Sequence, residues 1–170
     1  MITFNHDLLF DLVKNKISIE QFAIGTVRIG ATIDAINITE INDIYVSGLE
    51  NQSDYTISER LGKLCYNNGW VHFAGGLSCD IKSQTIDGLK IRKRYIEKIN
   101  HFTREDIIGF HGKPDYELID YWPWGLNIDV ENYILSYNSK KLHFYIDPKT
   151  NKLTEIRTGL LNKKEYESRV

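Results

Sequence analysis

The sequence is poor in cysteine and has no long hydrophobic run. Its two cysteines, Cys65 and Cys79, are too few for the disulfide framework of a small secreted domain. No apolar run approaches the ~18 residues from which a membrane-spanning helix is recognised. Residues 1–7 (MITFNHD) show neither the basic region nor the apolar run of a signal peptide. We therefore expect a cytoplasmic protein with no membrane partner.

An excess of charge of one sign is also lacking. There are 21 lysines and arginines against 23 aspartates and glutamates, which gives a formal net charge of −2 at pH 7. A general nucleic-acid coat needs clustered cations that neutralise phosphates, so the composition argues against a nucleic-acid partner. One basic stretch, residues 90–98, is short, and we interpret it as a solvated face.

The residues that are abundant favour a sheet. Hydrophobic residues make up 42% of the chain, and there are 23 isoleucines and ten tyrosines but only three prolines. Branched and aromatic side chains suit the pleated surface of a sheet. At 170 residues the chain has the size of one domain, or of two small modules that share a core.

The chain also resembles itself at an offset of 71 residues. Residues 64–67 and 71–73 (LCYN and VHF) match residues 135–138 and 142–144 (LSYN and LHF) without a gap. Agreement at one offset across two separated blocks indicates a duplication. Chance similarity between two hairpins is the alternative.

The same offset aligns two helix starts. Thr32 matches Thr103, and each threonine is followed by an acid two residues later and an isoleucine four residues later. This pattern is typical of a helix start, where the hydroxyl caps the helix and the carboxylate meets its positive end. We expect two diverged repeats, each a short helical layer packed on an antiparallel β-meander. The predicted fold class is α+β.

The second repeat has the clearer plan. The pattern predicts a helix, a turn with glycine and proline, and four strands over residues 102–108, 109–114, 116–121, 133–137, 142–146 and 153–158. In the last three strands, apolar residues alternate with polar ones, which predicts that one face is buried against the helix. The residues of this face are Leu135, Tyr137, Leu142 and Phe144.

The chain as a whole divides into three segments. We predict an N-terminal helix and connection over 1–24, a first α+β module over 25–88, and a second module with a charged C-terminal tail over 89–170. The first helix is expected over 6–15 with Asn5 as its cap. We expect the last eight residues to be frayed.

Three residues of the first repeat have the chemistry of a zinc site. A hairpin that turns at residues 68–69 would pair Cys65 with His72, and a second turn at 75–76 would pair His72 with Cys79. A structural zinc ion needs four ligands, and the chain has no further cysteine. We therefore predict no metal site and no cofactor.

Catalytic motifs are lacking as well. The chain has neither a Gly-x-Ser-x-Gly sequence nor a phosphate-binding GxxxxGK run. We interpret the titratable residues around the predicted helix as a capped helix start and a polar turn. These residues are His101, Glu105, Asp106 and His111. We predict no catalytic residues and no enzymatic activity.

The most informative stretch is residues 115–131, which holds five carboxylates and no lysine or arginine. Tyrosine and tryptophan are enriched in interface hot spots, and carboxylates around them would steer a basic partner. The predicted partner-binding residues are Asp115, Tyr116, Glu117, Asp120, Tyr121, Trp122, Trp124, Asp129 and Glu131. In the alternative, the sequence Trp-Pro-Trp forms a core corner and the acids form a solvated rim.

The second repeat resembles the module of β-lactamase inhibitor proteins and of related small outer-membrane assembly lipoproteins. The similarity lies in the Thr-x-acid start at Thr103, the sequence GKPD at 112–115, and the meander sequences YILSY, LHFYID and LTEI. It covers residues 102–158 and, more weakly, 25–81. The resemblance implies helices packed on antiparallel sheets, with a concave aromatic surface that grips an enzyme.

The chain departs from the secreted members of that family. It has no signal peptide, no lipobox cysteine and no cysteine pairs to staple each module. An intracellular partner is therefore expected, as for bacterial immunity proteins that neutralise delivered toxins. We expect a protein-binding inhibitor of a basic toxin or enzyme. The alternative is a small-molecule or regulatory binding domain that uses the groove between the two modules.

Overall fold

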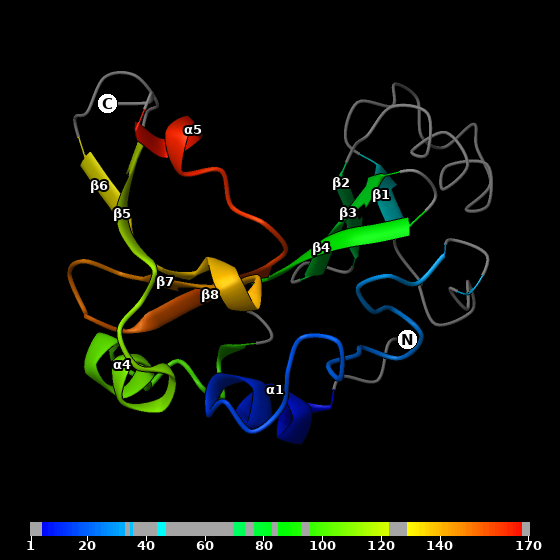
Figure 1. Cartoon of the computed structure of the whole chain (residues 1–170), viewed down its shortest axis with the longest axis horizontal. Helices are drawn as coiled ribbons and strands as arrows, with labels where there is room; N and C mark the ends of the chain where they lie inside the picture. The colour runs from blue at the N-terminus through cyan, green and yellow to red at the C-terminus, as the bar shows by residue number, and fades with distance from the viewer. Residues whose placement is uncertain are drawn as a thin grey trace.

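The computed structural model describes residues 5–32, 35, 44–46, 70–73, 77–82, 85–92, 96–122 and 129–167. In these ranges the chain forms an antiparallel sheet with short helices, which confirms the predicted α+β class (Figure 1). The strands are β1 (Ile44–Val46), β2 (Trp70–Phe73), β3 (Leu77–Lys82), β4 (Thr85–Ile91), β5 (Tyr116–Trp122), β6 (Asp129–Tyr137), β7 (Leu142–Ile146) and β8 (Leu153–Thr158). Their order in the sheet is β1-β2-β3-β4-β8-β7-β6-β5.

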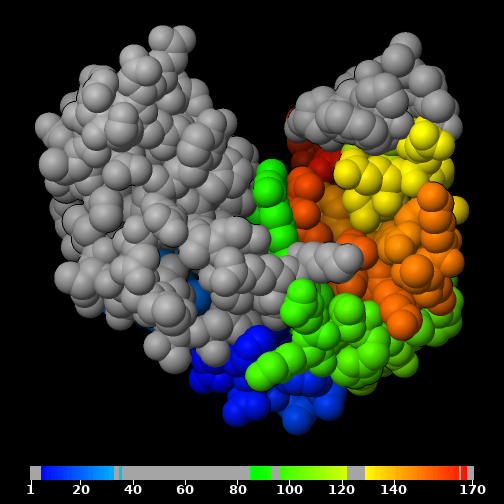
Figure 2. Space-filling view, turned by 180° about the vertical axis from the view of Figure 1, so that it is seen from behind, coloured from blue at the N-terminus to red at the C-terminus, as the bar shows by residue number. Residues whose placement is uncertain are grey.

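Helices lie on both sides of the second half of the sheet. α1 (His6–Val13) and α4 (Arg104–His111) lie on one side of β7 and β8, and α5 (Lys163–Glu167) lies on the other (Figure 1). A 3-10 turn, η4 (Asn138–Lys140), joins β6 to β7. Figure 2 shows α1, in blue, next to the green residues around α4 at one end of the molecule. The Asn15 side-chain amide donates to the Phe110 carbonyl at 3.2 Å, which ties the two helical segments together.

α1 forms where the sequence predicts it. The Asn5 side chain accepts hydrogen bonds from the backbone N–H groups of Asp7 (3.0 Å) and Leu8 (3.3 Å), and so satisfies two of the free donors of the first turn. The face toward the sheet is fully buried and carries Leu9, Leu12 and Val13. Burial of such side chains stabilises the fold by about 1.5–3 kcal/mol each.

α4 begins as predicted but ends later. Thr103 and Asp106 form a reciprocal capping box: the Thr103 hydroxyl accepts from the Asp106 N–H at 3.2 Å, and the Asp106 carboxylate accepts from the Thr103 N–H at 2.8 Å. The prediction of a turn from Gly109 is wrong, because the helix continues to His111. His111 Nε2 donates to the Val13 carbonyl at 2.8 Å, and this tertiary bond holds the last helical turn.

The chain leaves α4 at Gly112, which has φ +80°. This is a conformation that residues with a Cβ rarely adopt. The turn toward β5 therefore lies over 112–115, three residues later than the sequence indicates.

The sheet buries both of its faces near β6 and β7. On the side of α1 and α4, the predicted residues Leu135, Tyr137, Leu142 and Phe144 are all buried, together with Ile107 of α4. On the other side, a smaller cluster is buried beneath α5. Its members are Leu118, Ile134, Tyr145 and Tyr166. The prediction of one buried face is therefore incomplete, because the C-terminal segment covers the second face.

The structure of this C-terminal segment also contradicts the prediction that residues 163–167 are frayed. Residues 163–167 form α5, and Tyr166 is only 8% exposed. The Tyr166 ring packs into the cluster with Leu118, Ile134 and Tyr145, so its burial contributes to the stability of this turn.

No repeat is evident in the described ranges. The offset of 71 residues places β7 over β2 and, with a gap, β8 over β3, and both pairs are antiparallel hairpins. However, β2 pairs on its other side with β1, whereas β7 pairs with β6. Residues 64–67, the predicted counterpart of part of β6, lie outside the described residues, as does the predicted turn at 68–69.

The register of the hairpin formed by β2 and β3 contradicts the prediction that Cys65, His72 and Cys79 form one row across the sheet. β2 pairs with β3 so that His72 is opposite Ser78 and Val71 is opposite Cys79. His72 and Cys79 are therefore not cross-strand partners. A shift of one residue places them in different rows of the sheet. Cys65 lies outside the described residues.

Candidate functional site

The pleat of β5 divides the predicted partner-binding stretch between two faces of the sheet, because successive side chains of a strand point to opposite sides. Tyr116, Leu118 and Asp120 share one face. Leu118 is 8% and Asp120 is 6% exposed, and Tyr116 is partly buried against the cluster beneath α5. Tyr116 and Asp120 therefore serve packing more than contact with a partner.

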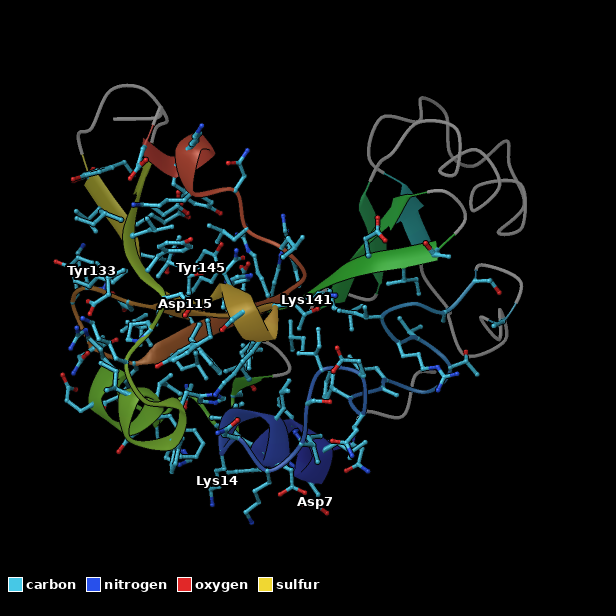
Figure 3. All side chains as sticks on the ribbon, viewed as in Figure 1. Asp7, Lys14, Asp115, Tyr133, Lys141 and Tyr145 are labelled. Carbon is cyan, nitrogen blue, oxygen red and sulfur yellow. The ribbon has the colours of Figure 1, made fainter. Side chains whose placement is uncertain are left out.

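The other face of β5 is open. Ile119 lies directly opposite Tyr133 of β6, and the two side chains are 39% and 41% exposed. Figure 3 shows Tyr133 at the β5–β6 end of the sheet, away from Lys141 and the η4 turn. Tyr121 follows Ile119 on the same face and is half-buried. These residues form an apolar and aromatic surface, called here the β5–β6 patch (Ile119, Tyr121 and Tyr133).

Glu117 stands at the lower border of the β5–β6 patch. Its carboxylate accepts a hydrogen bond from the Arg104 guanidinium of α4 at 2.6 Å. The two side chains are 53% and 34% exposed, so this pair is worth less than about 1 kcal/mol. Glu117 therefore carries a charge that α4 already compensates.

Carboxylates gather at the far end of β6. Burial, and then the neighbouring charges of Asp120 and Glu155, raise the pKa of Glu131. Glu155 forms an ion pair with Arg157, whose guanidinium lies 4.2 Å from the centre of the Tyr145 ring. Among the described residues, the charges that act on Glu131 are those of Asp120, Glu155 and Arg157, two carboxylates and one guanidinium.

The remaining predicted contact residues have different positions. Asp115 accepts a hydrogen bond from the Ser139 N–H at 2.7 Å, and this bond lowers the pKa of its carboxyl group. Asp115 therefore fixes the η4 turn. Asp129 is exposed at the start of β6. Trp124 and the side chain of Trp122 lie outside the described residues.

The titratable residues around α4 do not converge. Asp106 caps the helix, and Glu105 accepts from the Asn151 side-chain amide at 2.8 Å. His111 is buried, with a pKa lowered to about 4 by desolvation. His101 is exposed and stacks near Phe102, with ring centres 4.4 Å apart. Across the described ranges, no three His, Cys, Asp or Glu side chains lie close enough together to hold a metal ion.

A pocket lies at the other end of the second meander. It has a volume of about 350 Å³ between the segment that follows α1 and the η4–β7 connection. Its lining comes from residues 15–21 and 139–142 and includes Lys16, Lys140 and Lys141. Sequence reasoning missed this pocket, because its two walls are more than 100 residues apart in the chain.

Sequence reasoning also missed Ile119 and Tyr133. A signal for Ile119 was present: it alternates with Leu118, so burial of one implies exposure of the other on a strand. For Tyr133 there was none, because its residue type fits a core as well as a surface.

Within the helices that the structure describes, none is long and apolar enough to cross a membrane. Comparison with known proteins gives no match: no family model, no curated protein and no solved structure is significantly similar to this chain. The resemblance to β-lactamase inhibitor proteins therefore stays a prediction from the sequence.

Proposed function

We propose that this chain is a protein-binding inhibitor, which neutralises a basic intracellular toxin or enzyme as an immunity protein does. The observation that carries the proposal is the exposed cross-strand pair of Ile119 and Tyr133 on β5 and β6. In the described ranges, the titratable side chains around α4 do not converge, so they offer no catalytic site as an alternative to this surface.

The β5–β6 patch suits a protein partner. A tyrosine and an isoleucine held in register by a sheet lose little conformational entropy when a partner covers them. Among the described strands, β5 is also the last in the order of the sheet, so no described strand pairs with its outer edge.

Charge selects the kind of partner. Asp129 and Glu131 are exposed on β6, within a few residues of Tyr133. Partial desolvation and the charges of Asp120 and Glu155, which lie on the α5 face of the sheet, raise the pKa of Glu131. Bringing lysine or arginine side chains of a partner to this end of the sheet would relieve that repulsion. A basic partner is therefore favoured, and its association should be faster at low salt.

The predicted duplication and the cytoplasmic location belong to the same proposal. What supports the duplication is that β7 overlies β2 at the offset of 71 residues and that, with a gap, β8 overlies β3, so both segments are antiparallel hairpins. In tandem inhibitors of the family that the sequence resembles, the duplicated sheets provide the contact surface. Trp122 and Trp124 remain proposed contacts, next to the β5–β6 patch in the chain.

The test compares three tagged forms of the chain, expressed in its own cells and purified at low salt. The double variant Ile119→Ser/Tyr133→Ser removes the exposed pair. Leu160→Ser is the matched control, because Leu160 is an apolar side chain with 78% exposure outside the patch. We expect one stoichiometric protein that the wild type and the control retain and the double variant loses.

The purified partner then tests the role of charge. Asp129→Asn/Glu131→Gln should slow association by about tenfold at low salt and flatten its dependence on salt. A double variant of exposed acids elsewhere, Asp7→Asn/Glu167→Gln, should change neither. Retention of the partner by the Ile119/Tyr133 double variant would refute the assignment of the patch.

A second candidate function is a small-molecule or regulatory binding domain. The pocket between residues 15–21 and 139–142 favours it. This pocket is not the groove between modules that the sequence predicts, because its walls are the N-terminal segment and the η4–β7 connection. A chain that purifies without a protein partner but with a bound small molecule in native mass spectrometry would place this candidate first.

A further inference from the structure

The pocket is basic although the chain as a whole is slightly acidic. Three lysines, Lys16, Lys140 and Lys141, line it against a single carboxylate, Glu20, whereas the formal net charge of the chain is −2. Cations around a concave space focus the field and raise the local concentration of anions.

Both walls of the pocket are fixed by the fold. The Lys16 N–H donates to the Asp11 carbonyl at 2.8 Å, and the Lys141 carbonyl accepts from the Gly159 N–H at 2.8 Å. Asn15 and Lys141 have φ angles of +59° and +53°, so each redirects the chain at the rim. A ligand would therefore find the walls already in place, which lowers the entropic cost of binding.

The lysine charges are partly compensated, since the carboxylate of Asp115, which accepts from the Ser139 N–H, interacts with the charge of Lys140. Lys140 Nζ lies 3.4 Å from the Asn15 side-chain oxygen and 3.5 Å from the His111 carbonyl, and both of these acceptors are neutral. The Lys16 ammonium lies 3.7 Å from an Asp11 carboxylate oxygen, in a pair whose side chains are 64% and 40% exposed. Such an exposed pair is weak.

Glu20 offsets one of the three lysine charges, because the Ser18 hydrogen bond and the charge of Lys141 lower its pKa and keep its carboxylate ionised. The lining residues therefore keep an excess of two positive charges, three lysines against one glutamate. Figure 3 places Lys141 beside η4, on the side of the segment that follows α1. The ammonium groups of the pocket thus come from both walls.

We propose that this pocket binds a small multivalent anion of the phosphate-ester or pyrophosphate class. Its volume of about 350 Å³ falls within the usual range for small-molecule sites, roughly 300–1,000 Å³. Lysine binds phosphate as a point charge, and Ser139 stands among the lining residues with a hydroxyl that can act as a neutral donor. The site goes beyond the proposed inhibitor function, because it lies away from the β5–β6 patch.

Inorganic pyrophosphate is the probe. It is titrated into the full chain, labelled with nitrogen-15, while sodium chloride keeps the ionic strength constant. We expect saturable shifts of the backbone amide signals of residues 15–21 and 139–142. Chloride alone should shift them little.

Two double variants with the same change in net charge locate the site. Lys16→Gln/Lys141→Asn removes two pocket charges, and asparagine is chosen because it tolerates the positive φ of residue 141. Lys149→Gln/Lys164→Gln removes two exposed lysines outside the pocket. The pocket variant should weaken binding by about tenfold or more, since hydrogen bonds to charged groups are the strong ones. The control should bind within about twofold of wild type.

The single variant Lys16→Gln keeps the proposal testable if the double variant does not fold, because Lys16 is exposed. It should weaken binding by at least about threefold. Shifts that do not saturate, or an equal loss in both double variants, would overturn the proposal in favour of general charge screening. Binding of an acidic peptide without binding of pyrophosphate would also overturn it, and would assign the pocket to a protein partner.

Discussion

The hydroxyl groups of Tyr145 and Tyr166 lie 2.9 Å apart in a buried hydrogen bond that joins the centre of the sheet to α5. Tyr145 is fully buried on β7, and Tyr166 is the residue that fixes the C-terminal segment. The bond gives Tyr145 a polar partner inside an otherwise apolar cluster. It explains why a segment of mostly charged residues is ordered.

Tyr166→Phe should lower the free energy of unfolding by about 1–3 kcal/mol, because it leaves the Tyr145 hydroxyl buried without its partner. Urea unfolding at neutral pH measures this change. Tyr166→Ala should cost more, since it also removes the ring from the cluster. Lys164→Ala, on the same helix, is the control and should be nearly neutral. Equal stability of all three variants would restore the prediction of a frayed tail.

The buried His143 should make stability depend on pH. Its Nε2 donates to the Gly159 carbonyl at 2.7 Å, its Nδ1 lies 2.9 Å from the Ser136 hydroxyl, and desolvation lowers its pKa to about 4. Below about pH 6.5 the unfolded chain binds a proton that the folded chain refuses. Stability should therefore fall as the pH drops from 6.5 to 4, by on the order of 3 kcal/mol for this group.

His143→Gln should reduce the pH dependence over this range by about half, because the buried His111, whose pKa is also lowered to about 4, keeps its own contribution. His101→Gln is the matched control, since His101 is exposed, and it should leave the slope unchanged. Urea unfolding at several pH values between 7 and 4 provides the comparison. An unchanged slope in His143→Gln would show that the imidazole is not held neutral.

The capping box of α4 should be worth a measurable amount of stability. Thr103→Ala removes the hydroxyl that accepts from the Asp106 N–H, and should cost about 0.5–2 kcal/mol. Thr103→Ser keeps the oxygen and should stay close to wild type. Thermal unfolding followed by circular dichroism distinguishes the two. A loss of equal size in Thr103→Ser would assign the effect to the methyl group instead.

Asp115 should contribute to stability and not to partner binding. Its carboxylate accepts from the Ser139 N–H, which lowers its pKa below the ordinary value of 3.8. The contribution is therefore present above about pH 4 and is lost as the pH falls through the lowered value. Asp115→Ala should cost about 1 kcal/mol at pH 7, as measured in urea. A large change in affinity for a partner with no loss of stability would reverse this assignment.

The sequence correctly predicted those features of the fold that depend on interactions between residues close together in the chain. Asn5 and Thr103 cap the two helices as predicted, and strands β7 and β8 begin and end at the predicted residues. These features depend on hydrogen bonds or on side-chain alternation within a few residues. The sequence did not predict where α4 ends, because the hydrogen bond between His111 and Val13 joins residues 98 positions apart.

The candidate sites also combine features that the sequence indicated with features that only the tertiary structure shows. The sequence pointed to residues 115–131 as an acidic and aromatic stretch, but only the pleat of β5 separates the buried Asp120 from the exposed Ile119. The pairing of Ile119 with Tyr133, and the meeting of Lys16 with Lys141 at one pocket, depend on how distant segments come together.

By itself, the sequence determined the α+β class, the helix caps and the bounds of β7 and β8, since each of these follows from the properties of neighbouring residues, whereas β6 begins at Asp129, four residues before the predicted start. Only the tertiary structure decided where α4 ends, that α5 covers the second face of the sheet, and which side chains form the patch and the basic pocket. The physical reason is that burial and charge excess belong to surfaces built from segments far apart in the chain, and no local pattern encodes which segments meet.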